Sequence, residues 1–387
     1  MSQPIQAVKR PRDTRIDLLR GLALAMIYIN HVPGTIYEHY TSRNFGFSDA
    51  AEAFVMIAGI SAALAYGRYY VPGKTFFMAG VWRAWGRVWM LYLVQMTIVV
   101  IVTAFVAFML RYAQFPDMMA ADGFRRLVND PISVLIGLPT LGYQYGYINI
   151  LPLYMVLLAF VPALLWLGQR WPLWTLAGSV ALWFFAGYVR VNFPTYPLGG
   201  GWFLNPLSWQ LIFVGGMLTG LGMTQDRRFV PVKPWLVALA SAYLVLSLVW
   251  MQFPAVKSLG NAFMVQLSQL GAPRIITNFN KTYAEAPRLL HIFALAYVIS
   301  VLPWFKKGSG AWYFEWLSVM GRQSLPIFAL GTVLSFVGKG ILRWNAPASG
   351  WLQFAVIFGG LAILIGFAFA REAAHRSMKS ATAALKG

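Results

Sequence analysis

The sequence contains no cysteine, and this absence excludes several kinds of chemistry. A chain without Cys has no disulfide bond, no thiolate metal site and no cysteine that carries an acyl group as a thioester. The sequence also has no cluster of His, Asp and Glu at zinc-ligand spacing, no glycine-rich phosphate loop and no Gly-x-Ser-x-Gly motif. We therefore expect neither a metal site nor a bound cofactor. The absence of Cys is compatible with exposure to an oxidising compartment outside the cytoplasm.

Charged residues are also scarce. They make up 11% of the chain, compared with about 25% of a typical soluble domain. Hydrophobic residues make up 59% and the mean hydropathy is +0.60, so the chain has too little polar surface to be a water-soluble globule. Its apolar runs of about 20 residues contain Pro, Gly and single ionisable residues, which favours helices over an alternating barrel. The predicted fold class is all-α, a polytopic bundle of about ten transmembrane helices.

The apolar runs predict ten membrane spans within one domain that covers residues 1–387. A basic leader at 1–16 precedes them and a basic tail at 371–387 follows them. We expect no cleavable signal peptide, because the first apolar run lacks a small-residue cleavage site. No internal repeat is present in the sequence. The predicted spans cover about residues 18–37, 50–67, 88–110, 147–167, 173–191, 207–223, 235–253, 289–305, 316–337 and 351–370.

Acidic residues are few, since 12 Asp and Glu stand against 31 Lys and Arg, and the net charge is +19. A strongly basic composition can indicate a protein that binds nucleic acid. No block of five or more Lys and Arg occurs here, so we expect no binding of nucleic acid. Most of the basic residues lie on one side of the membrane if the N-terminus is cytoplasmic. This bias predicts a multi-pass protein with both termini in the cytoplasm.

Two connections on the predicted outer side are long, at 111–146 and 254–287. Loops of more than about 15 residues are usually functional or disordered. Because both segments keep apolar residues throughout, we expect short helices that partly re-enter the bundle.

A histidine lies near the end of the first apolar stretch. Arg20 and His31 are about three helical turns apart, so their side chains point nearly the same way, and Asp17 falls on the same face. The helical rise between Arg20 and His31 is roughly 16 Å, about half of a hydrocarbon core. Ionisable side chains at membrane depth are functional candidates, so we predict catalytic roles for His31, Arg20 and Asp17. The alternative is a histidine that only hydrogen-bonds a neighbouring helix.

Two carboxylates lie at the outer entrance of the second span. Asp49 and Glu52 are three residues apart, so they share one face of a helix. The short connection makes the first two spans antiparallel neighbours, which allows a carboxylate to reach His31 and fix its tautomer. We therefore include Asp49 and Glu52 among the catalytic candidates. For Asp49 the alternative is a helix cap.

Two arginines precede the third span. Arg83 and Arg87 are four residues apart and share a face near the predicted cytoplasmic surface, in a segment expected to lie along the interface. Guanidinium groups match phosphates in shape and charge. With Arg68 and Arg322 they form a candidate binding site for a polyanionic donor. The alternative is that these side chains only snorkel to the interface under the positive-inside bias.

A last cluster lies at the start of the eighth span. Pro287 suits the first turn of a helix, and Glu285 just before it suits the positive end of the helix dipole. His291 follows one turn inside the outer surface. We predict that this cluster binds a polar acceptor, or alternatively that His291 hydrogen-bonds within the bundle. The predicted acceptor-binding residues are His291, Arg288, Glu285 and Arg43.

Several of these stretches resemble the OpgC family, which belongs to the wider acyltransferase-3-like group of membrane acyltransferases. The strongest similarity lies in residues 12–24 and 29–34, and the run 44–55 is nearly as specific. Arg83 and Arg87 match the paired arginines of the wider group. The segments 150–154 and 321–325 extend the resemblance over most of the chain.

The resemblance implies a ten-helix enzyme of the bacterial inner membrane. Such an enzyme takes an acyl group from cytoplasmic acyl-CoA and transfers it to a glycan hydroxyl outside the cytoplasm. For OpgC-like proteins the acyl group is succinyl and the acceptor is an osmoregulated periplasmic glucan. The essential histidine of the family maps onto His31, and the arginine of its first helix maps onto Arg20. The implied partners are acyl-CoA as a co-substrate, the glucan and the lipid bilayer.

A different function class uses the same ionisable residues. A proton-coupled secondary transporter or flippase would employ His31, Asp49 and Glu52 as a proton relay. Transporters often show internal repeats, and the sequence has none. For an acyltransferase, the residues are compatible both with direct attack by the sugar and with an acyl-histidine intermediate. The sequence does not determine the oligomeric state of the protein.

Overall fold

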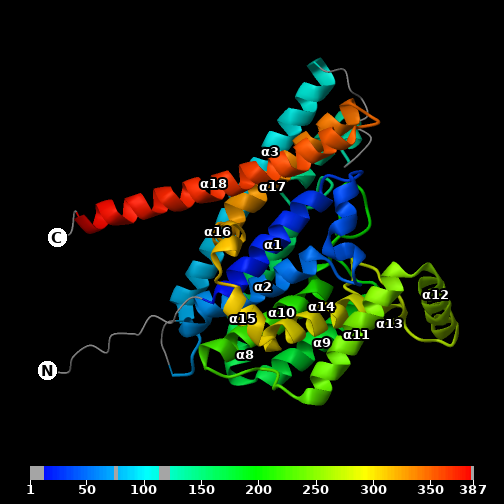
Figure 1. Cartoon of the computed structure of the whole chain (residues 1–387), viewed down its shortest axis with the longest axis vertical. Helices are drawn as coiled ribbons and strands as arrows, with labels where there is room; N and C mark the ends of the chain where they lie inside the picture. The colour runs from blue at the N-terminus through cyan, green and yellow to red at the C-terminus, as the bar shows by residue number, and fades with distance from the viewer. Residues whose placement is uncertain (1–12, 74–76, 113–122, 385–387) are drawn as a thin grey trace.

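The computed structural model describes residues 13–73, 77–112 and 123–384, and within these ranges the chain is built from helices (Figure 1). The pairing of Pro194 with Gly201 is an isolated β-bridge. Short 3-10 helices form at η1 (Ile36–Tyr40), η2 (Ser42–Asn44), η3 (Gly67–Tyr69) and η4 (Trp312–Phe314). The α-helices are α1 (Thr14–Asn30), α2 (Ala50–Tyr66), α3 (Phe77–Tyr112), α5 (Arg125–Asn129), α6 (Pro131–Gly137), α7 (Ile150–Ala159), α8 (Val161–Arg170), α9 (Pro172–Val189), α10 (Pro206–Thr224), α11 (Pro234–Gln252), α12 (Pro254–Gln269), α13 (Arg274–Thr277), α14 (Ala286–Val301), α15 (Pro303–Gly308), α16 (Glu315–Arg322), α17 (Ser324–Trp344) and α18 (Gly350–Ala384).

The predicted all-α membrane bundle is confirmed. Among the described residues, seven helices are long and apolar enough to cross a membrane, and α7 with α8 forms an eighth span that is bent by 53°. The seven are α2 with its 3-10 extension η3, α3, α9, α10, α11, α17 and α18. The first and eighth predicted spans are the shorter helices α1 and α14, with 17 and 16 residues. All ten predicted segments therefore contain helices.

Three predicted boundaries were wrong. The first helix ends at Asn30 rather than near residue 37, because Pro33 and Gly34 follow it and Gly34 takes a positive φ of 88°. Arg83 and Arg87 lie inside α3 rather than in a separate interfacial segment. The ninth predicted span is broken at Gln323, and its membrane-crossing part, α17, extends beyond residue 337 to Trp344.

The two long connections differ from each other. Residues 113–122 of the first lie outside the described residues, but the part that follows packs into the core through Phe124 and Val134, as expected. In the second connection, α12 has no buried residue and lies at the edge of the molecule (Figure 1). The prediction of re-entry is therefore wrong for α12, which folds back on α11 where Gly260 faces the ring of Trp250.

The predicted leader and tail are described only in part. Residues 1–12 of the leader lie outside the described residues, and the chain enters α1 at Asp13, whose carboxylate accepts a hydrogen bond from the Arg15 backbone N–H at 3.1 Å. Burial alone would raise the pKa of Asp13, but hydrogen bonds and charge from Arg15 outweigh it and lower that pKa. The basic tail continues α18 to Ala384, and Figure 1 shows this part of the helix leaving the bundle.

Glycines allow the central helices to approach closely. A Cβ at Gly21 of α1 would collide with the backbone oxygen of Leu317 in α16, and a Cβ at Gly321 would collide with that of Asp17. Between α2 and α10, a Cβ at Gly59 or at Gly216 would likewise collide with a backbone oxygen of the other helix. Small residues at such crossings let backbones pack by van der Waals contact, which drives helix association in lipid. These crossings hold α1 against α16 and α2 against α10.

The two ends of the bundle are named here after α1. The Thr14 end is the end at which α1 begins, and the His31 end is the opposite one. Because α2 begins at Ala50, after the short connection that follows His31, it runs back from the His31 end towards the Thr14 end. Ionisable side chains lie at both ends of this helix pair.

Candidate active site

His31 is the residue that ends α1. Its backbone N–H donates to the Ile27 carbonyl at 3.0 Å. Its imidazole stacks on the Tyr147 ring, with the ring centres 4.5 Å apart and the planes inclined by 12°. The charged neighbours of the imidazole are Lys281, Lys339 and Asp49. His31 therefore stacks on an aromatic ring and lies within electrostatic range of charges from three other segments.

Arg20 and Asp17 lie towards the other end of α1. Arg20 donates to the Ser61 hydroxyl of α2, and its guanidinium approaches the Gly321 carbonyl at 3.5 Å. Asp17 is 4% exposed and lies where α1 crosses α16. The helical rise between Asp17 and His31 is about 21 Å, so Asp17 does not reach the imidazole. The prediction that Asp17 works beside His31 therefore does not fit the structure, because sharing a face does not bring side chains fourteen residues apart together.

Asp49 and Glu52 form the acidic half of a buried ion cluster. The two side chains make a capping box at the start of α2, in which Ala51 N–H donates to Asp49 at 2.8 Å and Asp49 N–H donates to Glu52 at 3.0 Å. Arg288 donates to Glu52 at 2.7 Å and to Asp49 at 3.3 Å. Lys281 donates to Asp49 at 2.5 Å. Asp49 is therefore both a helix cap and a partner in the cluster.

The predicted hydrogen bond between a carboxylate and His31 is not formed. For Asp49 and Glu52, both within the described residues, the hydrogen bonds go to Arg288, Lys281 and the backbone. The sequence pattern could not show this, because Arg288 and Lys281 follow more than 230 residues later and compete for the same oxygens. Burial alone would raise the pKa of Asp49, but the adjacent cations outweigh it and hold that pKa below its usual range.

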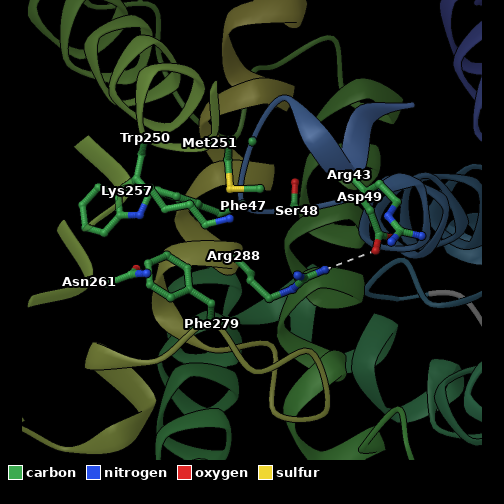
Figure 2. Close-up of a pocket in the computed structure, with 11 residues that line it drawn as sticks. Arg43, Phe47, Ser48, Asp49, Trp250, Met251, Lys257, Asn261, Phe279 and Arg288 are labelled. Atoms are coloured by element: carbon green, nitrogen blue, oxygen red, sulfur yellow. Dashed lines mark hydrogen bonds and ion pairs between the residues drawn. The ribbon is translucent and has the colours of Figure 1, made fainter. Parts of the chain in front are cut away.

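A cavity of about 300 Å³ opens beside this cluster at the His31 end, and we call it the Trp250 cavity. Figure 2 shows the Arg288 side chain extending towards Asp49 on one side of the cavity, with Trp250 and Phe279 on the other. The lining combines aromatic, amide and cationic side chains. The residues that line it are Arg43, Gly46, Phe47, Ser48, Asp49, Trp250, Met251, Lys257, Asn261, Phe279 and Arg288.

Three of the four predicted acceptor-binding residues gather at this cavity. Arg43 and Arg288 line it, and Arg43 also pairs with Glu38 at 3.5 Å. His291 lies just behind the lining, where its Nδ1 and the Ser48 hydroxyl share a hydrogen bond of 2.7 Å. His291 packs so closely on Gly46 that any larger side chain there would collide with the imidazole. His291 thus shapes the cavity wall through Ser48 and Gly46.

Glu285, the fourth predicted acceptor-binding residue, lies away from the Trp250 cavity lining. Its carboxylate is fully buried and accepts from Arg190 at 2.9 Å and from the Asn280 backbone N–H at 2.6 Å. Burial raises the pKa of Glu285, although both donors act in the opposite direction. Glu285 is not among the residues that line the Trp250 cavity. The prediction of an acceptor-binding role does not fit this position, because Glu285 ties the connection before α14 to the end of α9.

A second cavity, of about 150 Å³, lies towards the Thr14 end, and we call it the Arg20 cavity. Its two cations are Arg20 of α1 and Arg87 of α3. Aromatic, Leu, Ala and Ser side chains form the rest of the wall. The lining residues are Arg20, Phe54, Ala58, Ser61, Ala62, Ala65, Tyr66, Arg87, Leu91, Leu151, Tyr154, Ser324, Leu325 and Phe328.

The other predicted donor-binding arginines take two different positions. Arg83 and Arg68 both lie over the Tyr69 ring, with 5.4 Å and 4.9 Å from guanidinium carbon to ring centre. Arg322 is held by Glu315 at 2.6 Å and Glu372 at 2.9 Å, so it joins α16 to α18. Arg322 is absent from the lining of the Arg20 cavity. Because two carboxylates already pair with its guanidinium, Arg322 is in a poor position for the predicted role in donor binding.

Sequence reasoning did not identify Lys339, Tyr147 or Lys281 as site residues. Lys339 is 3% exposed and lies in α17, beyond the predicted end of the ninth span at residue 337. A lysine between two glycines, directly after the apolar run that ends at Val337, was the available signal. No local pattern links Tyr147 or Lys281 to His31, since only tertiary folding brings them together.

The same helices connect the two cavities to His31. Arg20 lines one cavity and lies three turns before His31 on α1, while Asp49 lines the other and is a charged neighbour of the imidazole. No group of three or more His, Asp and Glu that could hold a metal occurs in ranges 13–73, 77–112 and 123–384. The arrangement offers a proton acceptor, His31, with a basic cavity towards each end of the bundle.

Comparison with known protein families identifies the family of the chain. A family model described as OpgC protein matches residues 12–376. A search of curated proteins gave no match. The matched range covers nearly the whole chain and contains every residue of both cavities together with His31. The chain therefore belongs to the OpgC family, whose members are membrane acyltransferases of the glucan succinyltransferase type.

Proposed function

We propose that this protein transfers a succinyl group from acyl-CoA to a hydroxyl of a periplasmic glucan. The acyl-CoA enters the Arg20 cavity from the cytoplasm, and the glucan enters the Trp250 cavity from the periplasm. The protein lies in the bacterial inner membrane with both termini in the cytoplasm. The observation that carries this proposal is the position of His31, which shares α1 with the first cavity and lies within electrostatic range of Asp49, a lining residue of the second.

The Arg20 cavity suits the donor. Arg20 and Arg87 supply positive charge for the phosphates of CoA, to which guanidinium groups donate paired hydrogen bonds. The apolar wall beyond them suits the pantetheine arm. From Arg20 to His31 the helix rises roughly 16 Å, a distance that an extended pantetheine arm can bridge. The thioester would then lie near the imidazole while the nucleotide stays at the membrane surface.

The Trp250 cavity suits a sugar acceptor. Trp250 and Phe279 offer apolar ring faces for the C–H face of a sugar, and Asn261 with Arg43 offers hydrogen bonds to its hydroxyls. A mainly apolar cavity with a few placed polar groups is typical of small-ligand sites. The Asp49–Arg288 pair lines this cavity, and Asp49 also lies within electrostatic range of His31.

The transfer itself requires a base near the thioester. In the direct route, the His31 imidazole accepts the proton of a sugar hydroxyl while the hydroxyl oxygen attacks the thioester carbonyl carbon. The C–S bond breaks, the leaving thiolate takes the proton back from the imidazolium, and an ester remains on the glucan. Lys281, whose ammonium pairs with Asp49, is a positive charge within electrostatic range of His31, and such a charge would favour the negative charge that develops on the carbonyl oxygen. Attack by His31 itself, through an acyl-imidazole, needs the same unprotonated ring.

Proteoliposomes test the proposal. Purified protein is reconstituted, succinyl-CoA is supplied on the side of the Thr14 end and a neutral glucan on the other, and free CoA and succinylated glucan are measured. We expect both products to appear in equal amounts and only when both substrates are present. A transporter or flippase would move substrate without releasing CoA, and that result would contradict the proposal. Release of CoA without any glucan ester would also contradict it.

A further inference from the structure

Ser48 and His291 form a buried pair that the transfer mechanism above does not use. The Ser48 hydroxyl oxygen and His291 Nδ1 are 2.7 Å apart, which is hydrogen-bond distance. Ser48 is 3% exposed and His291 is 6% exposed, so the surrounding protein shields the pair from bulk water. A serine hydroxyl that is hydrogen-bonded to an imidazole is the arrangement in which serine acts as a nucleophile. This pair is therefore a second place at which the protein can activate a hydroxyl group.

The fold brings the two residues together from distant segments and holds the ring in place. Ser48 directly precedes Asp49, the N-cap of α2, and His291 follows 243 residues later in α14. The imidazole packs on Gly46 so closely that a Cβ there would lie 2.0 Å from Nε2. When the ring carries its proton on Nε2, Nδ1 accepts the hydrogen bond from the Ser48 hydroxyl. His291 is then positioned to take the serine proton.

The Ser48 side chain belongs to the wall of the Trp250 cavity. Figure 2 shows its hydroxyl among the residues that line this cavity, so a molecule bound there can meet it. Arg288 lies one helical turn before His291 on α14, lines the same cavity and is a charged neighbour of the imidazole. Although Arg288 pairs with the carboxylates of the ion cluster, its positive charge would favour the negative oxygen that forms when a hydroxyl attacks a carbonyl. The cavity wall thus combines a nucleophile, a base and a cation.

Resting on the proposed function, which brings a glucan into this cavity, we propose that Ser48 exchanges acyl groups between sugar hydroxyls without acyl-CoA. The substrate class is a carboxylic ester of a glucan. The Ser48 oxygen attacks the ester carbonyl carbon while its proton passes to His291 Nδ1. The bond between that carbon and the sugar oxygen breaks, the sugar oxygen takes the proton from the imidazolium, and an acyl-serine remains. A second sugar hydroxyl then attacks the acyl-serine by the reverse steps, which forms a new sugar ester and restores Ser48.

The test is an exchange reaction that contains no acyl-CoA. Purified protein is incubated with a glucan that carries isotope-labelled succinyl esters and with an unlabelled glucan of different size, and mass spectrometry follows the label. We expect wild-type protein to transfer label to the second glucan and to carry an acyl group on Ser48, and Ser48→Ala to give no exchange. His291→Asn should lower the exchange rate about 10²–10⁴-fold, because its amide oxygen can replace Nδ1 as an acceptor but takes no proton. Ser247→Ala is the matched control and should exchange normally, because this buried hydroxyl donates to the Leu244 carbonyl within α11.

A second measurement decides the question even if Ser48→Ala does not fold. Because the chain has no Cys, Ser48→Cys introduces the single thiol of the protein. His291 should activate this thiol, so adding His291→Asn to Ser48→Cys should slow its alkylation by iodoacetamide about tenfold or more. Equal alkylation rates, or equal exchange by wild-type protein and Ser48→Ala, would overturn the inference. Wild-type protein that transfers from succinyl-CoA but shows no exchange would overturn it and leave the proposed function intact, whereas exchange without transfer from succinyl-CoA would contradict the proposed function alone.

Discussion

The buried carboxylates of Asp49 and Glu52 are balanced by cations from a distant part of the chain. Glu52 is fully buried and Arg288 is its side-chain partner, while Asp49 is shared by Arg288 and Lys281. Burying an ion pair gives little net stability, but removing one partner leaves an unpaired charge in the interior. The cluster therefore fixes how the connection before α14 meets the start of α2, and this contact forms one wall of the Trp250 cavity.

Arg288→Met should destabilise the protein strongly, by about 3–5 kcal/mol, because Glu52 would keep only its backbone donor. The measurement is the thermal unfolding midpoint of the purified protein in detergent. Arg43→Met is the matched control, since the exposed pair of Arg43 with Glu38 is worth about 0–1 kcal/mol. The double variant Glu52→Gln/Arg288→Met should recover part of the loss. Equal midpoints for both single variants would show that the cluster does not organise this contact.

Arg87 and Arg83 should differ in their effect on the donor, although they are equivalent in the sequence pattern. Arg87 lines the Arg20 cavity, whereas Arg83 lies over the Tyr69 ring. Arg87→Ala should raise KM for acyl-CoA about tenfold, as for one lost charged hydrogen bond, and Arg83→Ala should raise it less. Steady-state kinetics with varied acyl-CoA measure this. Unchanged KM values with reduced protein abundance would mark both arginines as determinants of topology.

The helices themselves could largely be predicted from the sequence. Apolar runs, prolines at helix starts such as Pro206 and the Asp49 cap are local signals, and each of the ten predicted segments contains a helix. The breaks were harder to predict. The bend between α7 and α8 interrupts a run that remains apolar, and at Gln323 a short polar stretch separates two apolar segments within one predicted span. The sequence around each residue was enough to predict His31, Arg20 and Arg87 as site residues. The partners of Asp49, Glu52 and Arg322 could not be predicted in this way, since they depend on which helices pack together.

A substitution at the crossing of α1 with α16 tests how these helices pack. Gly21→Ala should lower the unfolding midpoint and the yield of folded protein, because the added Cβ meets the Leu317 backbone oxygen and overpacking costs about 1–3 kcal/mol or more. Gly366→Ala in α18 is the matched control, because no atom lies near its Cβ position and alanine favours the helix. If the two variants unfold at the same temperature, α1 and α16 do not cross at Gly21.

The whole molecule presents different chemistry at its two ends. The Thr14 end carries the Arg20 cavity and the extended end of α18, while the His31 end carries the Trp250 cavity and α12. The proposed transfer between two compartments would need this polarity, because in it the CoA thioester and the glucan enter from opposite sides. The proposed orientation follows from the positive-inside bias and places the Thr14 end in the cytoplasm.

The absence of Cys makes this orientation directly testable. Single cysteines are introduced as Ser268→Cys in exposed α12 and as Ser377→Cys in the exposed end of α18, and spheroplasts are treated with a membrane-impermeant maleimide. We expect Ser268→Cys to react in intact spheroplasts and Ser377→Cys to react only after permeabilisation. The reverse pattern would place the Arg20 cavity outside the cytoplasm and would exclude cytoplasmic acyl-CoA as its ligand.

The central claim is that His31 carries out the acyl transfer, and one comparison tests it most directly. His31→Ala is purified beside His39→Ala, which removes an exposed histidine in the following connection, and succinyl transfer from succinyl-CoA to glucan is followed by mass spectrometry. We predict that His31→Ala keeps its expression and unfolding midpoint but loses roughly 10²–10⁴-fold in turnover, whereas His39→Ala is unchanged. Near-normal glucan succinylation by folded His31→Ala would contradict the account.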